Sequence, residues 1–179
     1  MIFKKTKLAD ACVIELAKHE DDRGFLARTW DKVEFEKQGI FFEPVQGYVS
    51  YTAKKGTIRG IHYQVEPAAE AKLMRCTKGR IFEVIIDLKP NSPTYKKWQG
   101  FEFGAADCKM LFIPKGFGHA ILTLEDNCEF QNFSNQPHTP EFERGIRFND
   151  PALKIKWPIA VKIISQKDKS WEDFDDNSR

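Results

Sequence analysis

The sequence predicts an all-β protein, a double-sheet jelly roll with one or two short helices. Short apolar runs recur along the 179 residues, and turn signals such as segment 89–94 separate them. Several runs alternate apolar and polar residues, as strands with one buried face do. About ten runs follow one another without the regular strand–helix alternation of an α/β sheet, and this order favours a jelly roll.

The first half of the chain predicts strands and one helix. Segment 31–39 has a helical pattern, with Thr29 as a candidate N-cap and Gly39 past the C-terminus. The strands expected in this half are 12–16, 24–30, 44–52, 56–64 and 71–79.

The second half predicts further strands and a short terminal helix. Segment 80–88 is almost continuously apolar, so both of its faces should be covered. Segment 165–174 is expected to contain a helix, because Ser165 and Asp168 have the spacing of a capping box. The other strands expected here are 97–103, 109–114, 119–124 and 128–134.

The composition is typical of a globular chain, and the length predicts a single domain over residues 1–179. The 28 basic and 26 acidic side chains leave a net charge of +2, which argues against nucleic acid or a membrane as a partner. This balance still permits an anionic small-molecule site. The N-terminus lacks a signal-peptide pattern, and no run of about 18 apolar residues occurs, so a cytoplasmic protein is expected.

The four cysteines predict reduced thiols. None has the close spacing of a zinc site, and Cys76 and Cys128 are expected to act as small buried apolar side chains in strands. The other two are Cys12 and Cys108.

Polar residues occur on strands whose inner faces should be buried, and such residues need a partner or a ligand. Strict alternation in "RGIHYQ" points Arg59 and His62 to opposite faces, but a bulge at Gly60 would turn both inward. Each residue also has a plainer interpretation: Arg59 as a solvated charge, His62 as an imidazole bonded to backbone, and His119 as a structural turn residue. The remaining polar candidates for the inner face are Gln64, Lys72, Arg75, Gln131 and Asn132.

The histidine spacing disfavours a metal site. Metal-binding barrels of this kind usually carry a His-x-His pair with a nearby carboxylate, since their ligands must meet in one coordination sphere. Here His62 is followed by Tyr63 and Gln64, and the other histidines stand alone in the sequence.

A set of motifs between about residue 20 and about residue 170 occurs in a specific order. They read DDRGF, GTIRGIHYQ, AKLMRC, IFEVIIDL, SPT, FIPKGFGHA, PEFERGIRFNDP, IKWP and SQKD. The ordered set resembles the dTDP-4-dehydrorhamnose 3,5-epimerase family. The resemblance implies a cupin-type jelly-roll barrel, a homodimer that exchanges N-terminal strands between protomers, and no metal or organic cofactor.

The resemblance also implies a chemistry. Its substrate is a nucleoside-diphosphate 4-keto-6-deoxy sugar, a hexose or a heptose, used in surface-polysaccharide biosynthesis such as that of capsule or lipopolysaccharide. The ketone acidifies the C3–H and C5–H bonds, so a base can remove a proton, cations can hold the enolate, and an acid can return a proton to the opposite face. His62 matches the family's base, Asp168 matches the carboxylate that orients it, and Lys72 matches a cation near the keto oxygen.

Further positions match residues of the family's ligand cleft. Arg23 resembles a residue that binds the diphosphate, for which a guanidinium is well suited. The remaining substrate-binding residues that the resemblance implies are Gln46, Arg59, His119, Glu143 and Lys167.

The chain departs from the family pattern where a tyrosine serves as the catalytic acid, because Asn132 occupies that position. An amide can donate a hydrogen bond but cannot practically deliver a proton and take it back. Three outcomes are open: epimerisation at C3 alone with water, Tyr48 or Tyr63 as proton source, the full reaction through such a substitute, or binding without turnover. The first is favoured.

Three more departures concern the nucleotide. His138 stands where the family often has an aromatic residue that stacks on thymine, Arg28 replaces an acidic residue, and Tyr48 replaces an asparagine. These changes suggest a base other than thymine, with GDP or CDP as options. Two other function classes stay open: a non-catalytic sugar-nucleotide-binding protein and a cupin ketoisomerase.

Overall fold

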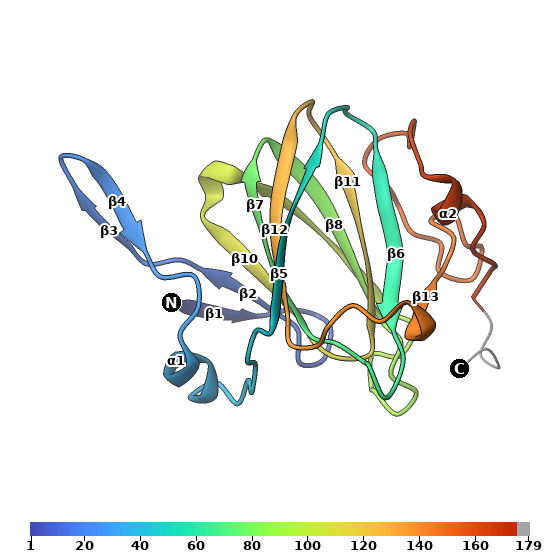
Figure 1. Cartoon of the computed structure of the whole chain (residues 1–179), viewed down its shortest axis with the longest axis horizontal. Coiled ribbons are helices and arrows are strands. Elements are labelled where there is room, and N and C mark those ends of the chain that lie inside the picture. Colours follow the sequence, from blue (N-terminus) through green and yellow to red (C-terminus); the bar gives the residue numbers. More distant parts are fainter. Residues whose placement is uncertain (175–179) are drawn as a thin grey trace.

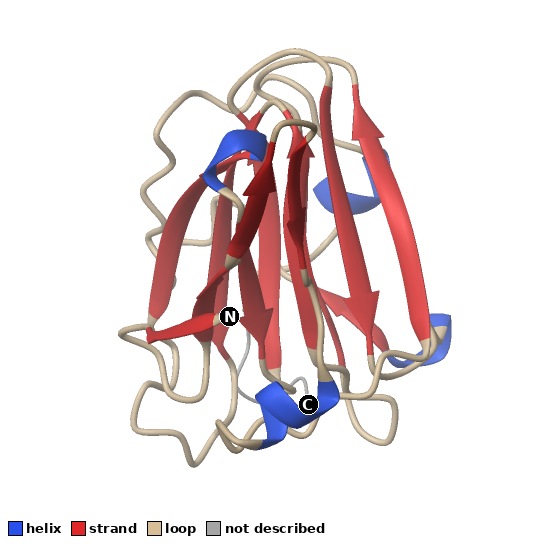
Figure 2. Cartoon of the chain, turned by 90° about the vertical axis from the view of Figure 1, so that its left-hand side faces the viewer, coloured by secondary structure: helices blue, strands red, loops and turns tan. Residues whose placement is uncertain are grey.

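Two antiparallel sheets pack face to face in the computed structural model, which describes residues 1–174 (Figures 1 and 2). Residues 175–179 of the expected domain lie outside the described part. The six-stranded sheet has the order β1 (Ile2–Lys5), β2 (Cys12–Glu15), β10 (Lys109–Ile113), β7 (Lys72–Lys78), β12 (Cys128–Ser134) and β5 (Gln46–Thr52). The five-stranded sheet has the order β13 (Glu143–Gly145), β6 (Ile58–Gln64), β11 (Phe117–Thr123), β8 (Arg80–Asp87) and β9 (Trp98–Gly104). The predicted all-β jelly roll is confirmed.

A third, two-stranded sheet forms an arm. It consists of β3 (Lys18–Asp21) and β4 (Gly24–Ala27), and it projects from the barrel on the side of the N-terminus (Figure 1). The arm exposes the apolar side chains of Phe25 and Leu26. Nothing else in the described chain pairs with these two strands.

Alternation along the strands builds the core between the sheets. Met74, Leu111 and Phe130 of the six-stranded sheet and Ile85 and Ile121 of the other belong to one buried cluster. Burying an aliphatic or aromatic side chain contributes about 1.5–3 kcal/mol. This layer therefore holds the sheets together and sets the width of the barrel.

Strand β8 is covered on both faces, as its apolar run predicts. Ile85 belongs to the core between the sheets, whereas Val84 and Ile86 pack in a second cluster with Ile146 and Leu153 of the C-terminal third. The C-terminal segment thus covers the outer face of the five-stranded sheet.

The helix predicted over segment 31–39 is shorter in the structure than the sequence pattern suggested. Helix α1 spans Lys32–Glu36, and its N-cap is Asp31, whose carboxylate accepts a hydrogen bond from the Glu34 amide at 2.9 Å. The prediction of Thr29 as N-cap is therefore wrong, because the helix begins two residues later than that residue would require. Gly39 lies past the end with a φ of 75°, as expected of a residue that stops a helix.

Three strands were not predicted from the sequence. Strand β1 is a short edge strand, β3 reads Lys-His-Glu-Asp without any apolar residue, and β13 has three residues. Two 3-10 turns, η1 (Ala105–Asp107) and η2 (Pro140–Phe142), complete the described chain with helix α2 (Gln166–Lys169). Among residues 1–174, no helix is long and apolar enough to cross a bilayer.

The four cysteines are buried and carry free thiols. Cys76 lies in β7 and Cys128 in β12, and both belong to the core cluster. The prediction that these two act as buried apolar residues in strands is confirmed.

Candidate active site

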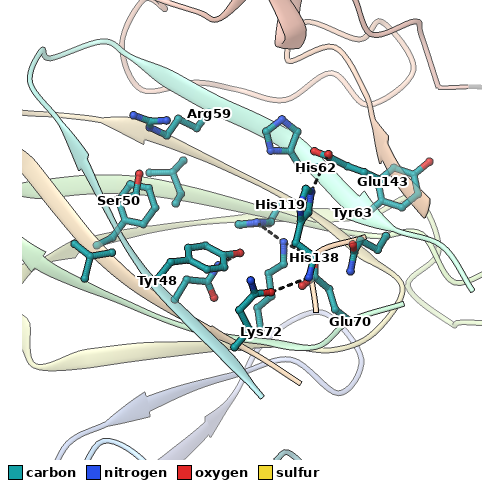
Figure 3. Close-up of a pocket in the computed structure, with 16 residues that line it drawn as sticks. Tyr48, Ser50, Arg59, His62, Tyr63, Glu70, Lys72, His119, His138 and Glu143 are labelled. Atoms are coloured by element: carbon teal, nitrogen blue, oxygen red, sulfur yellow. Dashed lines mark hydrogen bonds and ion pairs between the residues drawn. The ribbon is translucent and has the colours of Figure 1, made fainter. Parts of the chain in front are cut away.

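A pocket of about 430 Å³ opens between the sheets (Figure 3). Strand β6 forms one wall, β5, β7 and β12 form the opposite wall, and β11 contributes to the floor. Among the predicted site residues, the pocket brings together Gln46, Tyr48, Arg59, His62, Lys72, His119, Asn132, His138 and Glu143.

The bulge expected at Gly60 is present and aims β6 into this pocket. His119 of β11 pairs with His62 and the next residue, Ala120, pairs with Gly60, so Ile61 is extra in the ladder. Gly60 has a φ of 115°, and a Cβ atom there would lie 2.5 Å from the His119 carbonyl oxygen. Only glycine fits this position without a shift of the backbone. The bulge turns both Arg59 and His62 toward the pocket, as predicted.

His62 forms a pair with Asp168 of α2. Nε2 of His62 lies 2.5 Å from Oδ1 of Asp168, with 28% of the His62 side chain exposed and 5% of the Asp168 side chain. The plainer interpretation, a histidine bonded to backbone, is therefore wrong. A carboxylate at Nε2 holds the proton there and leaves Nδ1 as the proton acceptor.

Asp168 is held from two sides. Its Oδ2 accepts a hydrogen bond from the Gly60 amide at 3.3 Å, and its own amide donates to Oγ of Ser165 at 3.0 Å. Burial alone would raise the pKa of the Asp168 carboxyl, but the hydrogen bond and charge of His62 and the two other contacts lower it below its ordinary value. Asp168 therefore stays ionised, and it serves the helix N-terminus and His62 together.

A second histidine–carboxylate pair lies deeper. Nδ1 of His119 is 3.2 Å from Oε1 of Glu83, and the Glu83 side chain is fully buried. Burial raises the pKa of Glu83 well above its ordinary value, although the charge of Lys72 opposes this. Burial, then the charges of Lys72 and His62, lower the pKa of His119 well below its ordinary value. His119 is thus a neutral residue inside β11, not a turn residue.

Lys72 is a buried cation beside this pair. Its Nζ lies 3.0 Å from Nε2 of His119 and 3.0 Å from Oε1 of Glu70. Glu70 in turn accepts a hydrogen bond from Oγ of Ser134 at 2.6 Å. A buried, partnered ammonium of this kind can stabilise an oxyanion that forms next to it.

Asn132 and Tyr48 are direct cross-strand partners on β12 and β5. Nδ2 of Asn132 donates to Oη of Tyr48 at 3.5 Å, a long and weak contact compared with the usual N–H···O distance of about 2.9–3.0 Å. Oδ1 of the buried Asn132 has no hydrogen-bond partner among the described residues. Burial, followed by the charges of Glu70 and Glu143, raises the pKa of Tyr48 to about 12.

An ionic cluster lies at the mouth of the pocket. Nζ of Lys167 contacts both carboxylate oxygens of Glu143, at 2.7 and 2.6 Å, and Nε2 of His138 lies 3.0 Å from Oε2. Burial would raise the pKa of Glu143, but its hydrogen bonds with Lys167 and His138 lower it. Oε1 of Gln46 accepts from the His138 amide at 2.7 Å and so links β5 to this cluster.

Two predicted substrate contacts lie outside the pocket of this chain. Arg23 is at the tip of the arm, where 90% of its side chain is exposed and it contacts Asp21. Arg28 follows the arm and contacts Asp31 and Glu34. Arg59, in contrast, donates from Nε to Oγ1 of Thr52 at 2.9 Å and lines the pocket.

Arg75 and Gln131 do not line the pocket, so their prediction as inward-facing residues is wrong. They are cross-strand partners on β7 and β12. Residues two positions apart in a strand share a face. Leu73 lies two residues before Arg75 and Phe133 two residues after Gln131, and both pack on the outer side of the sheet with α1, so Arg75 and Gln131 face outward as well. Sequence reasoning missed Glu70, which lies two residues before Lys72, and Glu83, a charged residue inside the almost continuously apolar strand β8.

No group of three or more His, Cys, Asp or Glu side chains within residues 1–174 is arranged to hold a metal ion. The pocket chemistry that the described residues support is proton transfer: a partly exposed histidine oriented by a carboxylate faces a buried ammonium and a neutral histidine.

Comparison with known proteins identifies the family to which the chain belongs. The family model described as dTDP-4-dehydrorhamnose 3,5-epimerase matches residues 5–176. The chain belongs to the dTDP-4-dehydrorhamnose 3,5-epimerase family. It is therefore a carbohydrate epimerase, and its relatives have the same cupin-like fold.

Three relatives of this epimerase family illustrate the match. The Shigella flexneri dTDP-4-dehydrorhamnose 3,5-epimerase is 37% identical over 173 residues, which cover 96% of this chain and 95% of the relative. The Bacillus anthracis epimerase, solved with TDP and PPi bound, has 35% identity and a TM-score of 0.93, with 97% of this chain and 99% of that chain covered. A 3′-monoepimerase of Streptomyces bikiniensis in complex with dTDP-quinovose has 26% identity and a TM-score of 0.87, with 95% and 86% covered.

Proposed function

We propose that this protein inverts C3 of a nucleoside-diphosphate 4-keto-6-deoxy sugar by proton abstraction next to the ketone. The observation that carries the proposal is the His62–Asp168 pair, whose ring faces a pocket that also holds the buried Lys72 ammonium. A base and an oxyanion-stabilising cation are the two groups that enolisation needs.

In the proposed reaction, Nδ1 of His62 removes the C3 proton, and Asp168 stabilises the imidazolium that forms. The electrons of the C–H bond become an enolate whose oxygen is held by Lys72. The hydrogen bond between Lys72 and neutral His119 keeps the ammonium in place. A proton returned to the opposite face of C3 completes the inversion.

The proposed restriction to C3 rests on Asn132. The family's acid position carries an amide here, and an amide has no proton to give at neutral pH. The monoepimerase relative named above is a precedent for a member of this fold that acts at one carbon. Full 3,5-epimerisation and binding without turnover are the competing outcomes.

Solvent exchange separates these outcomes. The protein is incubated in deuterated water with an NDP-4-keto-6-deoxyhexose, and C3–H and C5–H are followed by NMR. Exchange with inversion at C3 alone is expected. Inversion at both carbons would support the full reaction, and no exchange with any nucleotide form would support a non-catalytic binder.

We also propose a homodimer in which the arm of one protomer completes the pocket of the other. The arm carries the exposed Arg23, together with the exposed apolar Phe25 and Leu26, and has no partner strand in the described chain. Light scattering during gel filtration should give twice the chain mass, and Arg23→Ala should raise KM with little change in kcat. A monomer with full activity would contradict this assembly.

For the nucleotide, we propose a base other than thymine, GDP or CDP. The support is His138 at the pocket mouth and Arg28 near the arm. Tyr48 gives less support, because it lies beside Asn132. Calorimetric affinities for dTDP, GDP, CDP and UDP test the proposal, and a clear preference for dTDP would overturn it.

We place the reaction in the cytoplasm, in the supply of sugars for a surface polysaccharide. The substrate proposed is an activated sugar, and the buried thiols are compatible with a reducing compartment. Detection of the protein in the soluble cytoplasmic fraction, with loss of a polysaccharide sugar on gene deletion, is the expected result.

A further inference from the structure

Inversion at a carbon needs two groups on opposite sides of the substrate. The base and the proton donor must approach from different faces, or the proton returns to the face it left. His62 belongs to β6 in the five-stranded sheet, so the donor is expected on the wall formed by β5, β7 and β12 of the other sheet.

The polar groups on that wall differ in what they can donate. Lys72 is committed to Glu70 and His119, and Asn132 carries an amide. Ser50 has an aliphatic hydroxyl, a much weaker acid than a phenol. Tyr48 carries the wall's phenol, on the edge strand β5, and Figure 3 shows its ring directed into the pocket.

Tyr63 also has a phenol at the pocket, but on the wrong side. It follows His62 on β6, and it packs against the cluster that contains Ile61 and Ile146 on the outer face of the sheet. A proton from this wall would reach the same face from which His62 removes one.

The Asn132 amide supports Tyr48 in a specific way. Because Nδ2 of Asn132 donates to Oη of Tyr48, the hydroxyl proton of Tyr48 is not used in that hydrogen bond. The same N–H group would stabilise the phenolate oxygen once the proton has left. The hydroxyl is protonated at neutral pH, as phenols ordinarily are.

We propose that Tyr48 donates the proton that completes inversion at C3, with Asn132 as its positioning residue. This inference rests on the proposed function and names the donor that it leaves open. Relative to the family pattern, tyrosine and asparagine have exchanged places across one cross-strand pair of β5 and β12.

The proton balance closes within the pocket and water. His62 takes the proton of C3, and the C–H electrons form the enolate. The enolate carbon then takes the proton of the Tyr48 hydroxyl, and the C=O bond of the ketone re-forms. The phenolate regains a proton from water through the open pocket, and the imidazolium returns one to water.

The test is Tyr48→Phe in deuterated water, with exchange and inversion at C3 measured separately. The variant should keep exchange at C3, because His62 can return a deuteron to the face it served, while inversion falls by about 100-fold or more. Retained exchange also shows that the variant is folded. Tyr51→Phe is the matched control, since Tyr51 lies on the same strand outside the pocket lining and its Oη contacts Asn127; it should invert at the wild-type rate.

Swapping the two residues of the pair gives a sharper test. Tyr48→Asn should lose inversion, and the combined Tyr48→Asn and Asn132→Tyr variant should recover it if a phenol at either member of the pair serves. Inversion by Tyr48→Phe at the wild-type rate would overturn the inference and leave the proposed function standing. Absence of exchange in the wild-type protein would overturn both.

Discussion

Two histidine–carboxylate pairs face one pocket, yet their surroundings differ. The His62–Asp168 pair joins β6 to α2 and keeps 28% of its imidazole exposed. The His119–Glu83 pair joins β11 to β8, where the carboxylate is fully buried and the imidazole nearly so. The residue types are alike, so burial and neighbours distinguish them.

These surroundings produce opposite electrostatics. The Asp168 pKa is lowered, because contacts with His62, Gly60 and Ser165 outweigh burial. The Glu83 pKa is raised, because burial outweighs the charge of Lys72. The outer pair therefore keeps an anion ready to stabilise a cationic histidine, whereas burial favours the neutral form of both members of the inner pair. The outer pair suits proton uptake, and the inner pair suits a fixed hydrogen-bond network behind Lys72.

The largest effect is expected from His62→Asn, which removes the proposed base, the histidine of the outer pair. Exchange and inversion at C3 should both fall by about 10⁴-fold. The measurement is deuterium incorporation by NMR. Exchange retained by His62→Asn would contradict the assignment of the base.

A smaller loss is expected from Asp168→Asn. The amide cannot stabilise the imidazolium, so kcat should fall by about 10²-fold or more. The helix N-terminus should survive, since its cap uses the Asp168 amide and the Ser165 hydroxyl. Asp173→Asn is the matched control in the same segment, where Asp173 contacts the exposed Arg147. Equal losses in both variants would indicate a merely structural role for Asp168.

Glu83→Gln should change activity by no more than a few-fold, because burial favours the protonated carboxyl, and the amide is a neutral group of similar shape. The folded-state pKa of Glu83 lies above its unfolded value, so its contribution to stability is present below about pH 4.5 and lost as pH rises toward the folded-state pKa. Glu83→Gln should therefore gain stability relative to the wild type as pH increases above 4.5. Chemical denaturation across pH measures this difference.

The contrast with Glu83→Ala completes this test. Alanine leaves a cavity and an unpaired His119 Nδ1, so stability should fall by about 2–4 kcal/mol at every pH. A large loss of activity in Glu83→Gln with unchanged stability would show that Glu83 acts as an anion and would remove the difference between the two pairs.

The smallest effect is expected from Ser165→Ala, which removes the helix cap but leaves the Asp168 carboxylate. Stability should fall by about 1 kcal/mol, and kcat should fall less than in Asp168→Asn. Denaturant titration and the exchange assay give the two values. A loss of activity as large as that of Asp168→Asn would mean that helix α2, and not its carboxylate, orients His62.

Sequence patterns predicted most of the strands and many of the residues that line the pocket. Alternation, apolar runs and turn signals predicted β2, β4 and β5 to β12. Most of these strands have one buried face and so repeat every two residues, whereas β8 was found from its continuous apolar run. The same rule missed β3, which has no apolar residue and pairs only with β4. Arg75 was misplaced because the rule was not applied strictly: alternation along β7 puts Arg75 and the pocket residue Lys72 on opposite faces.

The sequence by itself predicted the fold class, His62 as the base with Asp168 as its partner, and Asn132 at the position of the family's tyrosine. These predictions needed only the types of the residues and their order along the chain. Only the tertiary structure decided that the Gly60 bulge aims Arg59 and His62 into one pocket, and that Glu83 is fully buried with a raised pKa. It also showed that Tyr48 lies beside Asn132. These facts depend on strand register and burial, which arise only when segments far apart in the sequence pack together.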